Sequence, residues 1–237
     1  MRLFSTIKKD REYWLVDQVK EQGAAPEAYR KTFAELLEEW KQQQVGYLSL
    51  LMDEAYKDWL LGLGFRKISA IVEYTKELEG SADREPGITA ESLAESILTD
   101  SEFAVLYDRC RSGSANKNNL FSIEQIMESL SSELGADWRV HCFIFRENGQ
   151  AVGISIPHIE QGTADEGRLF YFGVVPEERG KGYGAILHRL SLGLMRERFN
   201  AIVYVGSTDE SNRHMIRIFE RNGCRLRDKK GIYRIGT

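Results

Sequence analysis

A strand that runs directly into a glycine-rich loop and then a helix is the feature of this sequence that most constrains its fold. Residues 169–175 are apolar and predict a short buried strand. Gly180, Gly182 and Gly184 follow at alternate positions, and apolar residues at helical spacing cover 185–195. A loop of this kind aims backbone N–H groups at one point, where the positive end of the helix dipole also lies. The segment therefore predicts a binding site for phosphate.

Two common phosphate-binding motifs fit this segment poorly. A P-loop needs four residues between its first glycine and the Gly-Lys pair, followed by Ser or Thr. Here Gly173 is too far from Gly180-Lys181, and Gly182 stands where the magnesium-binding hydroxyl is needed. A dinucleotide fingerprint needs Gly-x-Gly-x-x-Gly in an early βαβ unit, whereas this loop has Gly-x-Gly-x-Gly late in the chain.

A third kind of phosphate site matches the loop. The run Arg179-Gly180-Lys181-Gly182-Tyr183-Gly184 resembles the acyl-coenzyme A signature of the GNAT superfamily of N-acyltransferases, Arg/Gln-x-x-Gly-x-Gly/Ala. The preceding Val174-Val175-Pro176 resembles the strand end of that family. In the family, the loop amides bind the pyrophosphate of coenzyme A. Taken alone, six residues leave open an ordinary glycine-rich connection.

A second segment supports the same resemblance. Residues 201–206 are β-branched and aromatic and predict a buried strand. Helix-cap candidates follow at 207–212, then apolar residues at helical spacing over 215–219, and Asn222-Gly223 predicts the helix end. This order resembles the second motif of the family, in which Asn212 matches the position that contacts coenzyme A. Two motifs in the right order and separation are typical of a GNAT protein.

The resemblance implies an α/β fold, a mixed sheet with helices on both faces, over residues 86–237. Residues 1–80 are predicted to form a smaller N-terminal region, because the order strand, helix, glycine, strand at 45–78 recurs at 201–235. A degenerate GNAT-like half without the coenzyme A loop and a coincidence of common elements are both open interpretations. Polar residues with Gly and Pro at 79–87 predict a linker.

Local patterns predict the remaining elements. The first region is expected to contain helices at 10–22 and 26–44, a strand at 45–51, a short helix at 53–61 and extended chain at 65–78. The second is expected to contain helices at 90–98, 101–111 and 122–134, a polar loop at 112–119, and a hairpin of 139–146 with 151–157.

Composition narrows the class of protein. The chain has 237 residues and a net charge of −4, which does not favour bulk binding of nucleic acid. Without a long apolar run or a signal-like start, the chain is expected to be cytoplasmic, with no membrane contact. Three well-separated cysteines argue against disulfides and zinc, and no metal is expected; Cys142 and Cys224 are predicted to be packing residues.

The resemblance implies acetyl-CoA as co-substrate and a primary amine as acceptor. The residues that it assigns to the cofactor are Val174, Val175, Arg179, Gly180, Lys181, Gly182, Tyr183, Gly184, Ala185, Asn212 and Phe219. The amine must lose a proton before it attacks the thioester, since an alkylammonium titrates near ~10. The developing oxyanion then needs a positioned donor, and the backbone N–H of Val174 matches that donor in the family.

The acid and the base are where this chain departs from the family. Phe219 stands where relatives often carry a tyrosine acid, and Tyr183 or Tyr204 are the alternatives. Relatives often place Glu or His at the position of Phe170 or Arg168. Strand alternation predicts that Glu166, Arg168, Phe170 and Phe172 share one face, which makes Glu166 the candidate base. An exposed turn residue is the competing interpretation of Glu166.

Two functions follow from these residues. The first is an N-acetyltransferase that moves an acetyl group from acetyl-CoA to a primary amine by direct attack on the thioester. The second is an inactive or weak acyl-CoA-binding sensor, which Phe219 favours. The sequence does not distinguish a small-molecule acceptor from a peptide, and a homodimer is compatible with it.

Overall fold

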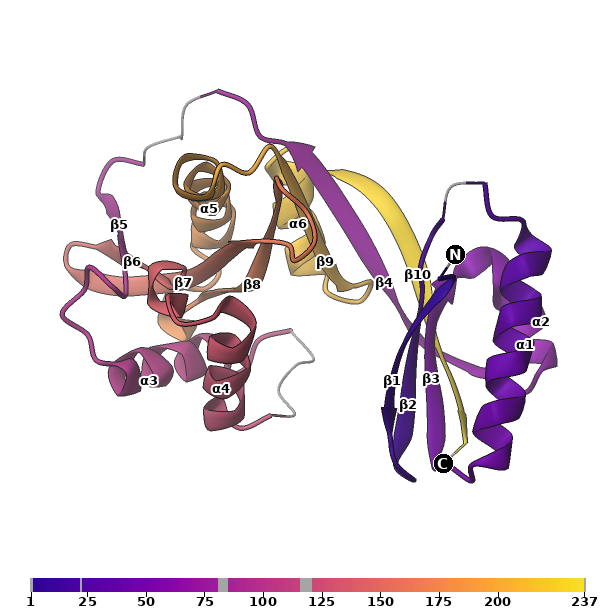
Figure 1. The fold of residues 1–237 in the computed structure, drawn as a ribbon. Helices are drawn as coiled ribbons and strands as arrows, with labels where there is room; N and C mark the ends of the chain where they lie inside the picture. The colour runs from indigo at the N-terminus through magenta and orange to yellow at the C-terminus, as the bar shows by residue number, and fades with distance from the viewer. Residues whose placement is uncertain (1, 22, 81–84, 116–120, 237) are drawn as a thin grey trace. The chain divides into compact units, whose positions relative to one another are not determined.

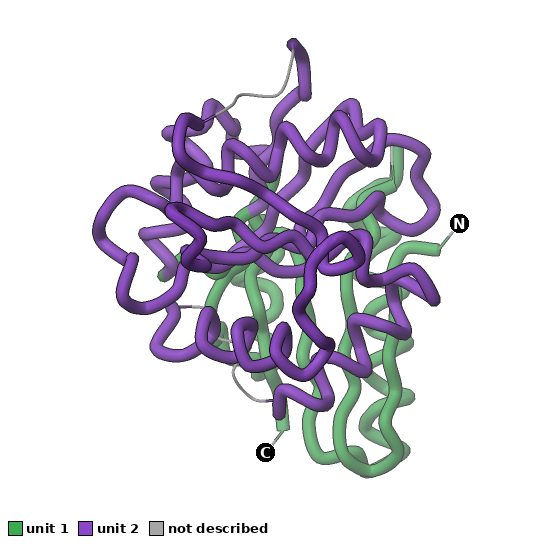
Figure 2. The backbone as a smooth tube through the Cα atoms, turned by 90° about the vertical axis from the view of Figure 1, so that its left-hand side faces the viewer, with its two compact units in different colours: residues 1–72, 209–211, 228–237 green, residues 73–208, 212–227 purple. Residues whose placement is uncertain are grey.

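The computed structural model describes residues 2–21, 23–80, 85–115 and 121–236 (Figure 1). The predicted linker residues 81–84 and the predicted loop residues 116–119 lie outside this range. The chain divides into two compact units (Figure 2). Unit 1 comprises residues 1–72, 209–211 and 228–237, and unit 2 comprises residues 73–208 and 212–227.

Unit 1 is a sheet with helices packed on one face. Its elements are β1 (Phe4–Lys9), β2 (Tyr13–Gln18), α1 (Pro26–Gln42), β3 (Tyr47–Asp53), the 3-10 turn η1 (Glu54–Tyr56), α2 (Lys57–Gly62), the first part of β4 (Arg66–Glu77) and the last part of β10 (Arg225–Gly236). β1 and β2 form an antiparallel hairpin, β2 and β3 are parallel, and β10 is antiparallel to β3. The predicted helix at 26–44 and the strand at 45–51 are confirmed within two residues.

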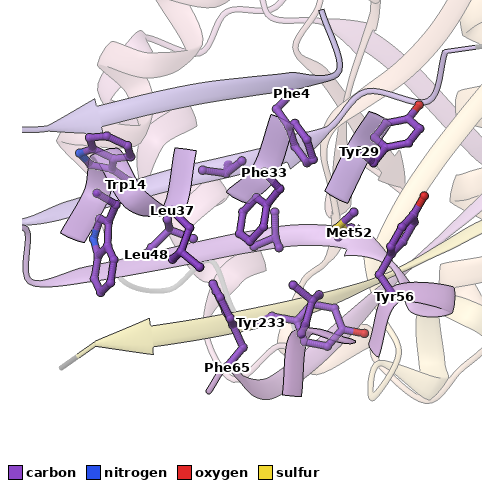
Figure 3. Close-up of a cluster of buried hydrophobic side chains, with 14 of the residues drawn as sticks. Phe4, Trp14, Tyr29, Phe33, Leu37, Leu48, Met52, Tyr56, Phe65 and Tyr233 are labelled. Carbon is purple, nitrogen blue, oxygen red and sulfur yellow. The ribbon is translucent and has the colours of Figure 1, made fainter. Parts of the chain in front are cut away.

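The core of unit 1 lies between α1 and the sheet (Figure 3). Pro26 occupies the first turn of α1, where its missing N–H costs nothing. Tyr29, Phe33, Leu37 and Trp40 then form one buried stripe. Phe33 is fully buried, and each side chain of this size contributes roughly 1.5–3 kcal/mol by burial.

Two predicted helices are wrong. Residues 13–18 form strand β2, in which Trp14 and Val16 are buried while Leu15 between them is exposed, a period of two rather than 3.6. Residues 88–92 form strand β5 (Ile88–Ser92), and turns follow it. Both segments are short, and their apolar residues at spacings of two and three fit either period.

Unit 2 is a sheet with helices on both faces. Its further elements are α3 (Asp100–Arg111), α4 (Ile123–Leu134), the 3-10 turn η2 (Trp138–Val140), β6 (Phe143–Glu147), β7 (Gln150–Ile159), β8 (Glu166–Val174), the 3-10 turn η3 (Pro176–Glu178), α5 (Tyr183–Phe199), β9 (Val203–Asp209) and α6 (Arg213–Arg221). One core joins α3 and α4 to β7 and β8, through residues that include Tyr107, Ile154 and Tyr171. A second core, with Val152 and Leu187, lies between α5 and the opposite face.

Local signals explain several boundaries of unit 2. Capping boxes of Thr99 with Glu102 and of Ser122 with Gln125 begin α3 and α4, as expected for these helices. The predicted hairpin is confirmed: Asn148 and Gly149 have φ of 49° and 79° in its two-residue turn. Residues 139–142 are not part of its first strand, because η2 covers 139 and 140 and β6 begins only at Phe143.

The strands form one mixed sheet in the order β1-β2-β3-β10-β4-β9-β8-β7-β6-β5, so the predicted α/β mixed-sheet fold is confirmed. The sequence of elements repeats, because β2-α1-β3-α2-β4 has the same order as β8-α5-β9-α6-β10. In the sheet, β10 stands beside β3 and β4 stands beside β9. Each half of the repeat therefore pairs with the last strand of the other half.

Candidate functional site

β8 and β9 run parallel but are paired only where they begin. The paired residues are Glu166 with Val203 and Gly167 with Tyr204. Beyond them, over the described residues, β8 has no recorded partner on this side, and residues 168–174 form what we call the unpaired edge. The equivalent strands of unit 1 differ, since β2 and β3 stay paired from Tyr13 to Asp17.

The backbone of β8 turns free donors toward the unpaired edge. The amide of Val175 donates to the carbonyl oxygen of Val152 in β7 at 3.1 Å. Because consecutive amides of a strand point to opposite edges, the amides of Val174 and Phe172 point away from β7. The amide of Val174, which the sequence assigns to the oxyanion, thus faces the unpaired edge.

A β-bulge at Phe170 changes which side chains of β8 share a face. Tyr171 pairs with Ile156 and Leu169 with Pro157, so Phe170 is the extra residue. A side chain at Gly167 would meet Met195 of α5, and Phe172 contacts His188 of α5 with ring centroids 5.7 Å apart. Residues 167 and 172 therefore both face α5.

This bulge overturns the predicted alternation along β8. Glu166 and Arg168 lie on the face opposite α5, whereas Phe172 faces α5, so the prediction that Glu166, Arg168, Phe170 and Phe172 share one face is wrong. Pro157 marks the position in the sequence, because proline cannot donate to a ladder and is found at bulges.

Glu166 is held by two arginines. Its Oε1 lies 2.6 Å from Arg168 Nη2, and its Oε2 lies 3.5 Å from Arg227 Nη1. Glu160 and Glu73 join the same network, at 3.1 Å from Arg168 Nε and 3.5 Å from Arg227 Nε. The carboxylate is thus one member of an ion-pair cluster on the α3 and α4 face.

The glycine loop leaves a row of donors at the N-terminus of α5. Gly180 and Gly182 have φ of 77° and 96°, and a Cβ at either position would meet nothing within 4 Å. Conformation rather than space therefore requires glycine there. Among the described residues, no acceptor is recorded for the amides of 180–184, as expected at the start of a helix. These amides and the helix dipole favour an anion at this end of the helix.

A further glycine brings two helices together. A Cβ on Gly184 would lie 2.8 Å from Ile218 Cδ1 of α6, so glycine at this position lets α5 and α6 approach closely. Asn212 caps α6: its Oδ1 accepts from the amide of Met215 at 3.2 Å, and its Nδ2 donates to Thr208 Oγ1 at 3.1 Å. Because β8 and β9 are parallel, Asn212 and the glycine loop, which follow their C-terminal ends, lie at the same end of the two strands.

The two basic residues of the loop differ in their contacts. Arg179 donates from Nε to the carbonyl oxygen of Val174 at 3.1 Å and from Nη2 to that of Cys110 at 3.0 Å. Lys181 is exposed and pairs with Glu178 at 2.9 Å. The guanidinium of Arg179 therefore joins the loop to β8 and α3, while the ammonium of Lys181 remains at the surface.

The aromatic candidates have distinct surroundings. Phe219 is buried and stacks on Tyr74, with centroids 5.0 Å apart. The hydroxyl of Tyr183 donates to Glu147, and this hydrogen bond raises the pKa of Tyr183 to about 12. Tyr204 is buried, with its hydroxyl 3.2 Å from His188 Nε2, and burial raises its pKa well above the usual value.

The cysteines are packing residues. All three are buried, and burial raises the pKa of Cys110 to about 12 and that of Cys224 to about 11. Thiols of this kind are not ionised near neutral pH and are poor nucleophiles. The prediction that Cys142 and Cys224 serve packing is confirmed by their burial.

A mixed sheet in which two parallel strands separate beside a glycine loop, at the start of a helix, defines an α/β protein whose loop amides and helix dipole favour an anion. The model of the acetyltransferase (GNAT) family matches residues 106–224, and the chain belongs to this family. Members of the family are acyltransferases that use acyl-coenzyme A and act on amine acceptors.

Solved structures share this fold. A GCN5-related N-acetyltransferase from Sphaerobacter thermophilus has a TM-score of 0.70 at 16% identity, over 98% of this chain and 76% of that one. A GCN5-related N-acetyltransferase from Kribbella flavida has a TM-score of 0.59 at 12% identity, over 93% and 80%. A tandem GNAT protein from the clavulanic acid biosynthesis pathway has a TM-score of 0.62 at 15% identity, over 94% and 75%.

At these identities the likeness shows the fold alone. No curated protein matches the sequence. Within the part of the chain that the structure describes, no helix combines the length and apolar character needed to cross a membrane.

Proposed function

We propose that this protein is an N-acetyltransferase that transfers the acetyl group of acetyl-CoA to a primary amine. One observation carries the proposal: the unpaired edge of β8 leads directly into the glycine loop, whose amides at 180–184 have no recorded acceptor among the described residues. The loop offers donors for a pyrophosphate, and the edge offers further backbone donors for the amide-containing arm of coenzyme A. Few other ligands combine a diphosphate with a chain of peptide-like groups.

The cofactor is proposed to lie across the C-terminal ends of β8 and β9. Gly180 to Gly184 bind the diphosphate through their amides, assisted by the charge of Lys181 and by Ala185 in the first turn of α5. Arg179 fixes the loop through its carbonyl contacts, and Asn212 and Phe219 border the cofactor from α6. Val175 supports this strand end from within the protein, because its amide is bonded to Val152 and its side chain is buried in the core with α3 and α4.

The chemistry places the thioester at the unpaired edge. The amide of Val174 stabilises the oxyanion that forms when the amine attacks the carbonyl carbon. Glu166 is the proposed base; because it lies at the start of β8 and Val174 at its end, it takes the proton of the amine through intervening water, and its Oε2 has the longer arginine contact, 3.5 Å to Arg227. The positive charge of an ammonium acceptor competes with that arginine for the carboxylate.

Binding and turnover test the proposal separately. Calorimetry with coenzyme A and acetyl-CoA measures the cofactor site without an acceptor. Thiol release from acetyl-CoA with a panel of primary amines, followed by product mass, measures transfer. A folded sample without heat of binding at millimolar acetyl-CoA would refute the assignment of the site.

A sensor is the second candidate function. Phe219 carries no hydroxyl, and both oxygens of Glu166 contact arginines, which favours a protein that binds acyl-CoA without rapid transfer. Binding of acetyl-CoA with no acetylated product from any amine of the panel would support the sensor.

A further inference from the structure

One face of the sheet in unit 1 is covered by no helix of that unit, among the residues that the structure describes. α1 and α2 both pack on the other face, in a core that includes Phe33, Leu48 and Leu60 (Figure 3). Unit 2 repeats the same order of strands and helices, but there α3 and α4 cover the second face. In unit 1 only β1 precedes β2, so the counterpart of α3 and α4 is missing.

The uncovered face, which we call the open face, carries the outward side chains of β1, β2, β3, β10 and the unit 1 part of β4. Its centre is apolar, and a shallow groove of about 270 Å³ is lined by Ile7, Leu15, Leu51, Ile71 and Ile232. Ile7 is 62% exposed and Leu15 is 38% exposed. Sheet faces that stay in water carry polar residues at these alternate positions, so the pattern indicates a face that is covered by a partner.

Arg234, on β10 of the open face, has no carboxylate partner among the described residues. Its Cζ lies 4.5 Å from the ring centroid of Tyr47, and its Nε is buried without a hydrogen-bond partner. A guanidinium in this state gains a charge-assisted hydrogen bond from any carboxylate that another molecule brings to it.

The other end of the open face has an excess of carboxylates. Asp17 pairs with Lys230 at 2.9 Å. Lys20 bridges Asp53 and Asp228, at 2.7 Å and 2.6 Å. Three carboxylates therefore share two ammonium groups. The side chain of Asp17 is 51% exposed, so it is accessible to a further cation.

The register of the strands allows the two ends to meet in a symmetric pair. Arg234 lies beside Ser49 on one side of β3. Asp17 lies beside Leu51 on the other side of β3. A two-fold axis in the plane of contact, over β3 between Ser49 and Leu51, exchanges these two positions. It brings Arg234 of each copy over Asp17 of the other and places the apolar centre against its own copy, as in an isologous interface.

The open face is also large enough for a weak dimer. Its five strands lie about 4.8 Å apart, and about six residues of each rise by about 3.3 Å, which gives a face of roughly 24 by 20 Å. Two such faces bury about 960 Å² even without the relief of their side chains, close to the lower limit of about 1,000 Å² for a specific interface. At this size a weak association is expected.

We infer that unit 1 is a dimerisation module, in which a second copy of this chain covers the open face and Arg234 of each copy pairs with Asp17 of the other. The inference does not depend on the proposed activity. It assigns a role to the part of the chain that repeats the order of elements of unit 2 without its glycine loop.

Analytical ultracentrifugation of the full chain tests the inference. We expect a monomer–dimer equilibrium with a Kd of about 1–100 μM. Ile7→Lys puts a charge into the groove and should weaken the dimer by about tenfold or more. Ile68→Lys is the matched control, because Ile68 is 52% exposed and alternation places it on the face of β4 opposite Ile71. The control should change the Kd by less than about threefold.

Two charge variants test the symmetric contact without removing any apolar side chain. Arg234→Glu sets two carboxylates against each other in the homodimer, and Asp17→Lys sets two cations against each other. Each variant alone should therefore be a monomer at concentrations where the wild type is a dimer. An equal mixture of the two variants pairs opposite charges at both contacts, so a heterodimer should form.

Three results would overturn the inference. The first is a wild type that stays monomeric up to about 200 μM, twice the upper end of the expected Kd range. The second is a dimer that Ile7→Lys and both charge variants leave unchanged. The third is a mixture of the two charge variants that forms no heterodimer, although circular dichroism shows both variants to be folded. If Ile7→Lys does not fold, the charge variants decide, since they change exposed or partly exposed side chains.

Discussion

Arg179 Nη2 donates to the main-chain oxygen of Cys110 at 3.0 Å, which joins the start of the glycine loop to the last turn of α3. The carbonyls of a last turn lack helical partners, and a cation there also meets the negative end of the helix dipole. The Tyr171 hydroxyl donates to the same oxygen at 2.8 Å. The arginine of the signature is therefore part of the scaffold beneath the loop.

Arg179→Met is expected to destabilise unit 2 by about 1.5–3 kcal/mol, because it removes charged donors from two carbonyls. Lys181→Met removes an exposed charge and should change the free energy of unfolding by less than about 0.5 kcal/mol. Urea unfolding of both variants measures the difference. Equal effects would show that the carbonyl contacts of Arg179 contribute little.

Gly182→Ala is expected to weaken coenzyme A binding by about tenfold or more, because alanine resists the φ of 96° that aims the loop amides. Gly162→Ala is the control: its φ is 87°, its Cβ would also meet nothing within 4 Å, and it lies outside the proposed site. Calorimetry with coenzyme A compares the two. Similar losses in both would mean that backbone strain, rather than the loop amides, limits binding.

Glu166→Gln is expected to lower kcat/KM most near neutral pH, where the amine is protonated and needs a base. The loss of kcat/KM should become smaller as the pH approaches the pKa of the alkylammonium near ~10, since the free amine then needs no base. Glu160→Gln is the control, because Glu160 pairs with the same Arg168 at 3.1 Å. A pH-rate profile identical for the two variants would assign Glu166 to the ion-pair cluster alone.

Acid should destabilise the protein through two buried histidines. Burial lowers the pKa of His188 to about 3 and that of His158 to about 4, against about 6.5 in the unfolded chain. The unfolded state then binds more protons below pH 6.5, so stability is full above that value and falls as the pH falls. Relative to neutral pH, the free energy of unfolding at pH 5 is lower by about 2 kcal/mol for each histidine.

Urea unfolding at pH 7.5 and at pH 5 measures this loss. His158→Gln should remove about half of the difference between the two pH values, because one of the two histidines no longer titrates. The same free energy of unfolding at both pH values in the wild type would contradict the burial of both rings as neutral groups.

Local signals in the sequence were sufficient to predict many of the helices and strands of unit 2. Capping residues at Thr99 and Ser122 and the Asn148-Gly149 turn act within a few residues, so α3, α4 and the β6–β7 hairpin follow from them. The glycine loop could be predicted for the same reason, because its motif lies within a few consecutive residues. The helix predicted at 10–22 failed because pairing with β1 and β3 decides the state of so short a segment.

Long-range contacts account for what the sequence did not show. The bulge at Phe170 depends on pairing with Pro157, and it reverses the face of every side chain on one side of it. A buried hydrogen-bond chain from Asn222 through His188 to Tyr204 joins three elements that are separated in the sequence. In the sequence, the only indication of this chain was a histidine, His188, among the apolar residues of helix α5.

The continuous pairing of β2 with β3 has a consequence for stoichiometry. Although the two halves of the chain repeat the same order of elements, the described part of unit 1 offers no separated strand pair like that of β8 and β9. A titration with coenzyme A should accordingly reach its end point at one equivalent per polypeptide.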